Sequence, residues 1–212
     1  KGLVMKKISI LFMVLLQFFA GALSAQNDSV LQSLYMRMTD SCVTMDYSYV
    51  LQSSDIKTTG DGNILLQGSN YVMKGNGLQI NCEGNTMWII DPEGKEVIMQ
   101  SASEGEQAYM DNPVLLFVDM PELFNIDSVR RTGQVSDYTL SPSVSCGIKS
   151  AMIEVASDAK SSVITSAHFA LSDGGELDIK IKSMTFSEKK PLTSFFYDVS
   201  GLDSSWLITD LR

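Results

Sequence analysis

Apolar and polar residues alternate one by one along much of this chain, and this period of two is the feature that most restricts its fold. The clearest case runs from Leu177 to Lys182, where Leu, Ile and Ile alternate with Asp, Lys and Lys. The segment from Met45 to Gln52 repeats the pattern. Because successive side chains of a strand point to opposite faces, both segments predict strands with one apolar and one wet face. At Ser183 the apolar positions change phase, which predicts a β-bulge or bend.

Turn signals divide the chain into about ten such strands. Clusters rich in Gly and Asn at 60–63 and 75–77 separate short apolar runs, and Asp91–Lys95 has Pro and Gly at turn positions. Apolar runs at 195–197 and 206–208 are expected to form the last strands. The sequence therefore predicts a series of antiparallel hairpins.

Two short segments read as helices. Asp28 to Met38 repeats apolar residues at a spacing of 3.6, with Asp28 placed to cap the first amides, and Asn112 precedes a Pro113 suited to a first helical position. The prediction is a mainly β fold: a strongly curved antiparallel sheet, an incomplete barrel, whose apolar face is covered by short lid helices. A closed barrel and a two-sheet sandwich are the competing architectures.

The first 25 residues have the pattern of an export signal. Lys6 and Lys7 precede an apolar run from Ile8 to Ala20, which ends in the small residues of 21–25. We expect residues 1–25 to be a cleaved signal peptide and 26–212 to be one domain, delivered across a membrane. No later apolar segment is long enough to span a bilayer.

Charge and composition restrict the partners. The signal holds three of the 16 basic residues and none of the 25 acidic ones, so the rest of the chain carries 13 against 25, a net charge of −12. Such a charge argues against nucleic acid and anionic lipid surfaces as partners. With one histidine, His168, we expect no metal, no cofactor and no catalytic constellation. Alternation places His168 on the wet face, where a solvated side chain is the preferred interpretation.

Three cysteines, Cys42, Cys82 and Cys146, leave two alternatives. In an oxidising compartment they can form one disulfide and one thiol, and the sequence does not choose the pair. Three buried thiols are the other alternative.

Several motifs resemble those of the lipoprotein carrier family LolA, and they follow one another in the same order as in that family. The residues from Glu83 to Pro92 (EGNTMWIIDP) are similar to its "D-G-x-x-L-W-x-Y-x-P" hairpin. The remaining similar segments are GNILL at 62–66, NPVLL at 112–116, YTLSP at 138–142, FFYD at 195–198 and TDLR at 209–212, the last resembling relatives from Bacteroides-like bacteria.

The resemblance implies a monomeric periplasmic carrier, not an enzyme, with helices as a lid over an apolar cavity. Such carriers take acylated lipoproteins from an inner-membrane ABC-type exporter and bring them to an outer-membrane acceptor. One position departs from the family. The family has a basic residue followed by Pro where this chain has Gln67–Ser69, a segment with neither a basic residue nor Pro. The contact between sheet and lid is therefore expected to differ.

Candidate residues of an acyl-chain-binding cavity follow from the alternation and the lid motif. On the concave wall we expect Tyr47, Tyr49, Leu66, Tyr71, Met73, Ile80, Trp88, Ile90 and Met99, with Phe169 and Ile179 from the second half and Leu115 and Phe117 from the lid. A register error of one residue would turn any strand outward. The ten methionines that follow residue 25 suit an adaptable cavity, although ordinary core packing explains them as well.

Three other functions compete with a lipoprotein carrier. One is a carrier of glycolipids or other lipids, and another is an envelope-stress sensor on the same scaffold, which usually has a further partner-binding domain. The third is a secreted enzyme that uses His168, for which no nucleophile or orienting acid is indicated.

Overall fold

The computed structural model describes residues 28–53, 56–104, 106–159 and 161–212. The predicted signal peptide, 1–25, lies outside these residues. Twelve strands form one sheet in the order β12-β6-β5-β4-β3-β2-β1-β11-β10-β9-β8-β7. Within the described ranges no helix is long and apolar enough to cross a membrane.

The sheet consists of two antiparallel meanders that meet where β1 pairs with β11. The first contains β1 (Cys42–Ser53), β2 (Ile56–Gln67), β3 (Asn70–Gly75), β4 (Leu78–Glu83), β5 (Thr86–Asp91) and β6 (Glu96–Ser101). The second contains β7 (Phe124–Thr132), β8 (Val135–Pro142), β9 (Ile148–Ser157), β10 (Ser162–Leu171) and β11 (Glu176–Ser187). The last strand, β12 (Leu207–Asp210), pairs parallel with β6.

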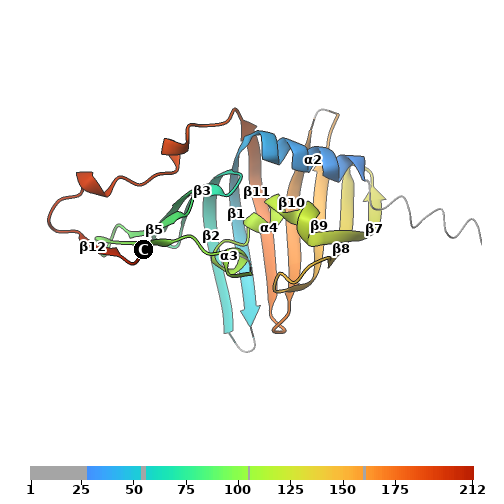
Figure 1. Cartoon of the computed structure of the whole chain (residues 1–212). Helices are drawn as coiled ribbons and strands as arrows, with labels where there is room; N and C mark the ends of the chain where they lie inside the picture. The colour runs from blue at the N-terminus through green and yellow to red at the C-terminus, as the bar shows by residue number, and fades with distance from the viewer. Residues whose placement is uncertain (1–27, 54–55, 105, 160) are drawn as a thin grey trace, which may run out of the picture.

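Short helices cover the concave face of this sheet (Figure 1). They are α2 (Ser29–Asp40), α3 (Glu106–Asp111), α4 (Leu115–Val118) and α5 (Met120–Leu123). The sheet curves but does not close, since β7 and β12 remain as separate edges. The predicted fold class is confirmed, and the closed barrel and the two-sheet sandwich are wrong.

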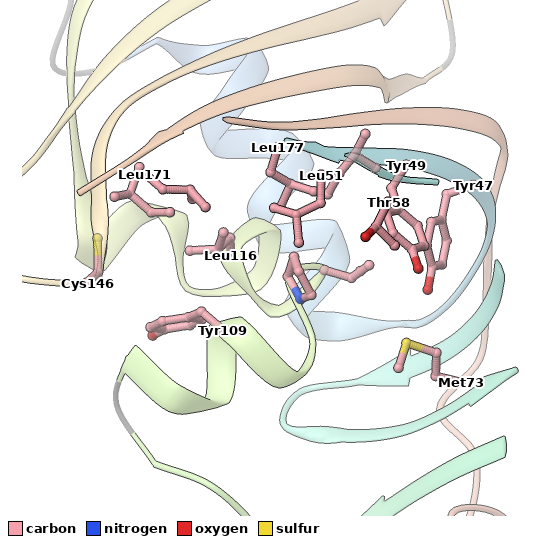
Figure 2. Close-up of a pocket in the computed structure, with 14 residues that line it drawn as sticks. Tyr47, Tyr49, Leu51, Thr58, Met73, Tyr109, Leu116, Cys146, Leu171 and Leu177 are labelled. Carbon is pink, nitrogen blue, oxygen red and sulfur yellow. The ribbon is translucent and has the colours of Figure 1, made fainter. Parts of the chain in front are cut away.

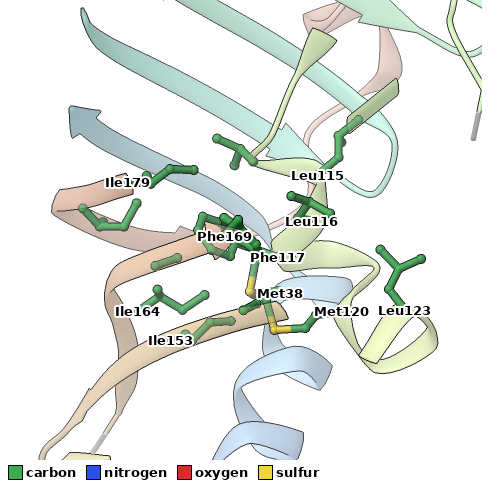
Figure 3. Close-up of a cluster of buried hydrophobic side chains, with 14 of the residues drawn as sticks. Met38, Leu115, Leu116, Phe117, Met120, Leu123, Ile153, Ile164, Phe169 and Ile179 are labelled. Atoms are coloured by element: carbon green, nitrogen blue, oxygen red, sulfur yellow. The ribbon is translucent and has the colours of Figure 1, made fainter. Parts of the chain in front are cut away.

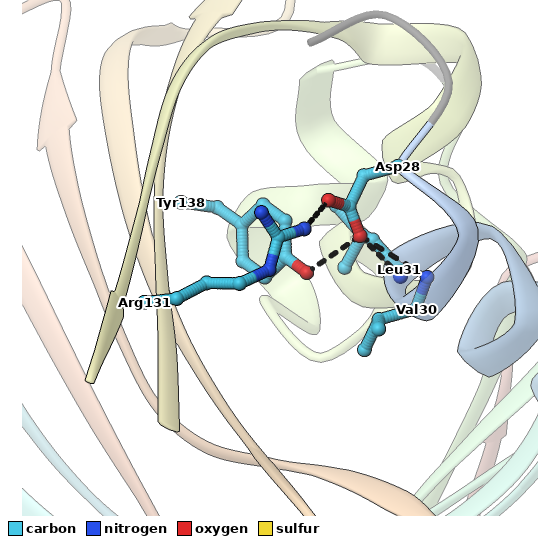
Figure 4. A network of polar contacts seen from close by, with 5 residues as sticks. All are labelled: Asp28, Val30, Leu31, Arg131 and Tyr138. Carbon is cyan, nitrogen blue, oxygen red and sulfur yellow. Dashed lines mark hydrogen bonds and ion pairs between the residues drawn. The ribbon is translucent and has the colours of Figure 1, made fainter. Parts of the chain in front are cut away.

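Helix α2 is fixed to the second meander by the residue that caps it. Asp28 Oδ1 accepts hydrogen bonds from the amides of Val30 and Leu31, at 3.1 and 3.3 Å, as the sequence predicts. The same carboxylate accepts a bond from the Tyr138 hydroxyl and pairs with Arg131 (Figure 4). One buried carboxylate therefore joins the start of the helix to β7 and β8.

The main hydrophobic core lies between the helices and the concave face (Figure 3). Phe117 of α4 packs against Phe169 of β10, with ring centroids 6.1 Å apart, and both are fully buried. Met38 of α2 and Met120 of α5 are buried beside them. At roughly 1.5 to 3 kcal/mol for each large apolar side chain buried, this layer holds the helices on the sheet.

Two local predictions are confirmed and two are corrected. Asp46 pairs with Ser183 but Tyr47 pairs with Ile181, so Lys182 is the extra residue of the predicted bulge. The last strand is present, as β12. Helix α4 begins two residues after Pro113, because the chain first makes a turn in which Asn112 Oδ1 accepts from the Val114 amide at 3.2 Å.

The expected strand at 195–197 is wrong. A 3₁₀ turn, η1 (Leu192–Ser194), leads into these residues, and a second, η2 (Val199–Gly201), follows them. Phe196 and Tyr197 are neighbours in sequence, yet both pack against the cluster around Trp88 on the outer face, which the alternation of a strand would not allow. The Phe196 ring meets Trp88 edge-on, at 5.1 Å between centroids.

Candidate functional site

An apolar cavity of about 240 Å³ lies between the concave face of the sheet and the helices α3 and α4 (Figure 2). Both meanders and the helical segment contribute to its walls. The lining residues are Tyr47, Tyr49, Leu51, Thr58, Met73, Tyr109, Pro113, Val114, Leu116, Cys146, Ile148, Leu171, Leu177 and Ile179. None of these described lining residues carries a charge, so the cavity is suited to an uncharged, apolar group.

The sheet wall is built by alternation on paired strands. Tyr47, Tyr49 and Leu51 point to one face of β1, and the register sets Tyr49 beside Ile179 and Leu51 beside Leu177 on β11. Such direct cross-strand neighbours have Cβ atoms roughly 4.5 to 5.5 Å apart, so they make a continuous apolar surface. The opposite wall comes from Tyr109 of α3 and Leu116 of α4.

Two glycines on β2 leave room for the tyrosines of β1. Gly62 pairs with Tyr47 and Gly60 with Tyr49. A Cβ at Gly62 would lie 2.6 Å from Cζ of Tyr47, and one at Gly60 would lie 2.7 Å from Cε1 of Tyr49. The tyrosine rings therefore lie across β2 in the space that the missing side chains leave, as aromatic residues often do beside strand glycines.

The cavity side of the helical segment is held by a hydrogen bond from Tyr109. Its hydroxyl donates to Asp119 Oδ2 at 3.1 Å, which joins α3 to the residue between α4 and α5. Burial raises the pKa of Asp119; the bond from Tyr109 lowers it, and the charge of Glu122 raises it further, so the pKa lies above 3.8. The carboxylate is thus kept in a place that disfavours its charge.

The structure brings four of the predicted cavity residues together: Tyr47, Tyr49, Met73 and Ile179 all line the cavity. A further group lies in the adjoining main core without lining it. This group comprises the buried Leu66, Tyr71, Leu115, Phe117 and Phe169, and the half-buried Ile80. The binding role of all ten residues remains a prediction.

Trp88, Ile90 and Met99 require a correction, because they lie on the opposite face of the sheet. They form a second hydrophobic cluster with Val97, and it is covered by the chain segment that follows β11. The register gives the reason: Trp88 pairs with Asn81, whose side chain donates to the carbonyls of Phe195 and Phe196 on the outer face.

The neighbouring Met87 lies on the concave side instead. Its sulfur is 3.6 Å from the hydroxyl of Tyr71, a residue of the main core. The expected phase of β5 was therefore wrong by one residue, as a strand with apolar residues on both faces allows.

Sequence reasoning missed part of the lining. Leu51, Leu171 and Leu177 share the alternating phase of the predicted residues, so the pattern itself could have identified them. Tyr109 and Cys146 lie on a helix and a loop, where no period marks the side that faces the cavity.

Gln67, in the segment where the LolA family has its basic residue, contacts the chain that follows β11. Gln67 Nε2 donates to the Lys190 carbonyl at 3.1 Å, and the Lys190 amide donates to Gln67 Oε1 at 2.7 Å. Gln67 therefore holds the segment that leaves β11.

The histidine and the cysteines can be compared with the predictions made for them. His168 lies on the outer face, as predicted, with Nδ1 2.8 Å from Asp178 Oδ1. Each of the three cysteines is a buried thiol, which is the second of the two alternatives.

Comparison with known proteins gives matches among solved structures alone. No family model matches the chain, and no curated protein matches it. An uncharacterized conserved protein from Thermus thermophilus aligns with a TM-score of 0.50 at 6% identity, over 85% of this chain and 96% of that one. At this identity the likeness concerns the fold alone.

Two further solved structures are similar at TM-scores of 0.41. A LolA superfamily protein from Nitrosomonas europaea is 13% identical over 80% of this chain and 99% of that one. A putative outer membrane lipoprotein-sorting protein domain from Vibrio parahaemolyticus is 10% identical over 78% and 94%. The architecture, with its unclosed sheet curved around short helices, is the one that the sequence motifs predict. The described residues form a strongly curved, unclosed antiparallel sheet covered by short helices, which is the fold class that the sequence predicts.

Proposed function

We propose that this protein is a periplasmic carrier that shelters the acyl chains of lipoproteins in its cavity. It receives them from an inner-membrane ABC-type exporter and delivers them to an outer-membrane acceptor. The observation that carries the proposal is the uncharged, apolar cavity between the curved sheet and the helices α3 and α4. The signal-like segment at 1–25 and the strongly acidic chain support an exported protein that does not adhere to anionic surfaces.

Energetics explain why such a cargo needs a shelter. Burial of an acyl chain is worth about 0.8 kcal/mol for each methylene group, so a lipoprotein with two or three chains does not leave a bilayer unaided. A carrier that hydrolyses no nucleotide must bury the chains about as favourably as the bilayer does, and it must still release its cargo. A cavity lined by aliphatic side chains, with Met73 as an adaptable member, meets both demands.

The volume of the cavity sets a condition on binding. At about 240 Å³ it is smaller than the roughly 300 to 1,000 Å³ of typical ligand pockets. Loading of acyl chains therefore requires the cavity to widen. The helices α3 and α4 are short and form one wall, so their displacement is the expected route.

The proposal is tested by native mass spectrometry, with lipid extraction, of the mature protein isolated from its own periplasm without detergent. A bound di- or triacylated polypeptide is the expected result. Free phospholipid or glycolipid alone would assign the cavity to lipid transport instead. An empty protein that also refuses added lipopeptide would overturn the proposal.

A matched pair of substitutions connects binding to the cavity. Leu51→Trp places an indole in the cavity and should weaken binding of a fluorescent diacylated lipopeptide by roughly tenfold or more. Val50→Trp is the control, because Val50 is the next residue of β1 and lines the outer face of the sheet. Equal affinity of the two variants would place the lipid elsewhere.

A further inference from the structure

One end of the cavity carries hydroxyl groups, although its lining is otherwise largely aliphatic. Tyr47, Tyr49 and Thr58 lie together where β1 and β2 form the wall, and Figure 2 shows their oxygens on this side of the cavity. Leu116 and Leu171 lie farther along, toward α4 and the end of β10. Three hydroxyls therefore gather at one end of the cavity, whereas the hydroxyl of the lining residue Tyr109, on another side, already donates to Asp119.

The two tyrosine hydroxyls are held in place by their surroundings. Each ring lies over a glycine of β2, Tyr47 over Gly62 and Tyr49 over Gly60, and the two ring centroids are 6.5 Å apart. The Tyr49 hydroxyl also accepts a hydrogen bond of 2.9 Å from Asn76 Nδ2, in the turn after β3. Positions fixed in this way before binding favour recognition of a particular group.

Both hydroxyls can act as hydrogen-bond donors. Burial, with a smaller contribution from Tyr49, raises the pKa of Tyr47 to about 12, so this phenol is protonated at neutral pH. Tyr49 accepts from Asn76, which leaves its own proton for another acceptor. Hydroxyl donors on the wall of an apolar cavity favour a ligand that brings acceptors, because a ligand that displaces water from them must replace the hydrogen bonds to that water.

The acceptor should be uncharged. None of the described residues that line the cavity carries a charge, so a phosphate or carboxylate would enter without a counter-ion, at a high desolvation cost. An ester carbonyl accepts hydrogen bonds without this cost, and it is attached directly to an acyl chain. A glycerol diester matches the arrangement of two donors beside an aliphatic cavity.

We propose that Tyr47 and Tyr49 bind the ester carbonyl oxygens of an O-acylated glyceryl group, whose chains extend toward Leu116 and Leu171. This inference rests on the proposed carrier function and adds the orientation of the lipid in the cavity. The glyceryl end lies beside Thr58, an exposed residue, so the attached polypeptide leaves the cavity on the β1–β2 side.

The test uses two fluorescent lipopeptides of equal chain length. One carries two ester-linked chains, and the other carries two ether-linked chains, which lack the carbonyl oxygens. The wild-type protein should bind the diester roughly tenfold more tightly, as expected for two modest hydrogen bonds. The double variant Tyr47→Phe, Tyr49→Phe should bind both lipopeptides with the affinity that the wild type has for the diether.

A third tyrosine provides the control. Tyr71→Phe removes a hydroxyl from the main core beside the cavity and should leave the preference for the diester unchanged. Thermal unfolding of each variant verifies that the fold is intact.

Three outcomes contradict the proposals, and they can be told apart. Equal binding of diester and diether by the wild type overturns the inference and leaves the carrier function standing. A diester preference that survives in the double variant overturns the role of the two hydroxyls. If neither lipopeptide binds, the proposed function itself fails.

Discussion

The hydroxyl of Tyr138 on β8 donates a hydrogen bond of 2.9 Å to Oδ1 of Asp28, which stands 110 positions earlier in the chain. The same oxygen caps α2, and the other carboxylate oxygen pairs with Arg131 of β7. Asp28 is 7% exposed, so its bonds form largely out of water. One side chain thus adds polar contacts between α2 and the second meander to the apolar packing of Leu31, Leu34 and Met38.

Substitution of Asp28 by Ala should lower the free energy of unfolding by about 1.5 to 5 kcal/mol. Loss of an N-cap costs about 0.5 to 2 kcal/mol, and a buried hydroxyl left without its acceptor costs about 1 to 3 more. Urea denaturation at pH 7 measures the change. Asp28→Asn keeps an oxygen for the cap and should lose less. Equal loss in both variants would mean that the charge, and not the cap, dominates.

The same carboxylate should make stability depend on acid pH. Burial alone would raise the pKa of Asp28, but the bonds from Tyr138, Leu31 and Val30 and the charge of Arg131 outweigh it and hold the pKa below 3.8. A lowered folded-state pKa stabilises the protein above pH 3.8, and this stability is lost as the pH falls through the folded value. Denaturation midpoints between pH 5 and pH 2 should therefore fall less steeply for Asp28→Asn than for the wild type. Parallel curves would contradict the assignment.

Asp119 should have the opposite effect on stability. Burial is the main reason why its pKa lies above 3.8, so its contribution is greatest below pH 3.8 and declines as the pH rises through the folded value. Asp119→Asn keeps an acceptor for the Tyr109 hydroxyl and removes the charge. We expect the variant to be more stable than the wild type at pH 7, with the difference vanishing near pH 3, where the Asp119 carboxyl is protonated. A variant that is less stable at pH 7 would show that the charge strengthens this bond.

The outer face of β5 can be tested separately from the cavity. Trp88→Leu should lower the free energy of unfolding by about 1 to 3 kcal/mol, because the indole packs against Phe196 and the segment after β11. Limited proteolysis should then cut within 188–206 more readily. Lipopeptide affinity should not change, since Trp88 lies on the face opposite the cavity. A loss of affinity in a folded variant would contradict this placement.

The glycine beneath Tyr47 should be intolerant of any side chain. Gly62→Ala places a Cβ within 2.6 Å of the phenol, so the ring must move toward the cavity. Overpacking of this kind costs about 1 to 3 kcal/mol and should also weaken lipopeptide binding. Gly201→Ala is the matched control, because a Cβ there meets nothing within 4 Å. Similar behaviour of the two variants would mean that Tyr47 adapts freely.

The sequence predicted the elements of the fold well because their signals are local. Alternation identified β1 and β11 and the bulge between them, where Lys182 is the extra residue. The cap of α2 followed from one side chain and its two nearest amides. These features depend on neighbours in sequence or on directly paired strands.

The cavity was harder to predict because its walls depend on packing over long distances. β5 carries apolar residues from Met87 to Ile90 without interruption, so alternation gave no phase, and Trp88 and Ile90 were assigned to the wrong face. The reason for this two-sided strand is the segment at 195–206, which returns to cover its outer face. No residue pattern near β5 in the sequence predicts that a distant segment covers its outer face.

The helices α3 to α5 also limit how the sheet can change shape. They lie in one connection, from Ser101 at the end of β6 to Phe124 at the start of β7, and these strands stand near opposite edges of the sheet. The connection therefore spans the concave side of the sheet from one end to the other. If the sheet flattens, the distance between β6 and β7 grows, and the connection must unwind or straighten. Under the proposed carrier function, the length of this connection limits how far the cavity can widen. Insertions or deletions between 102 and 123 would change that limit while leaving the sheet side of the cavity wall unaltered.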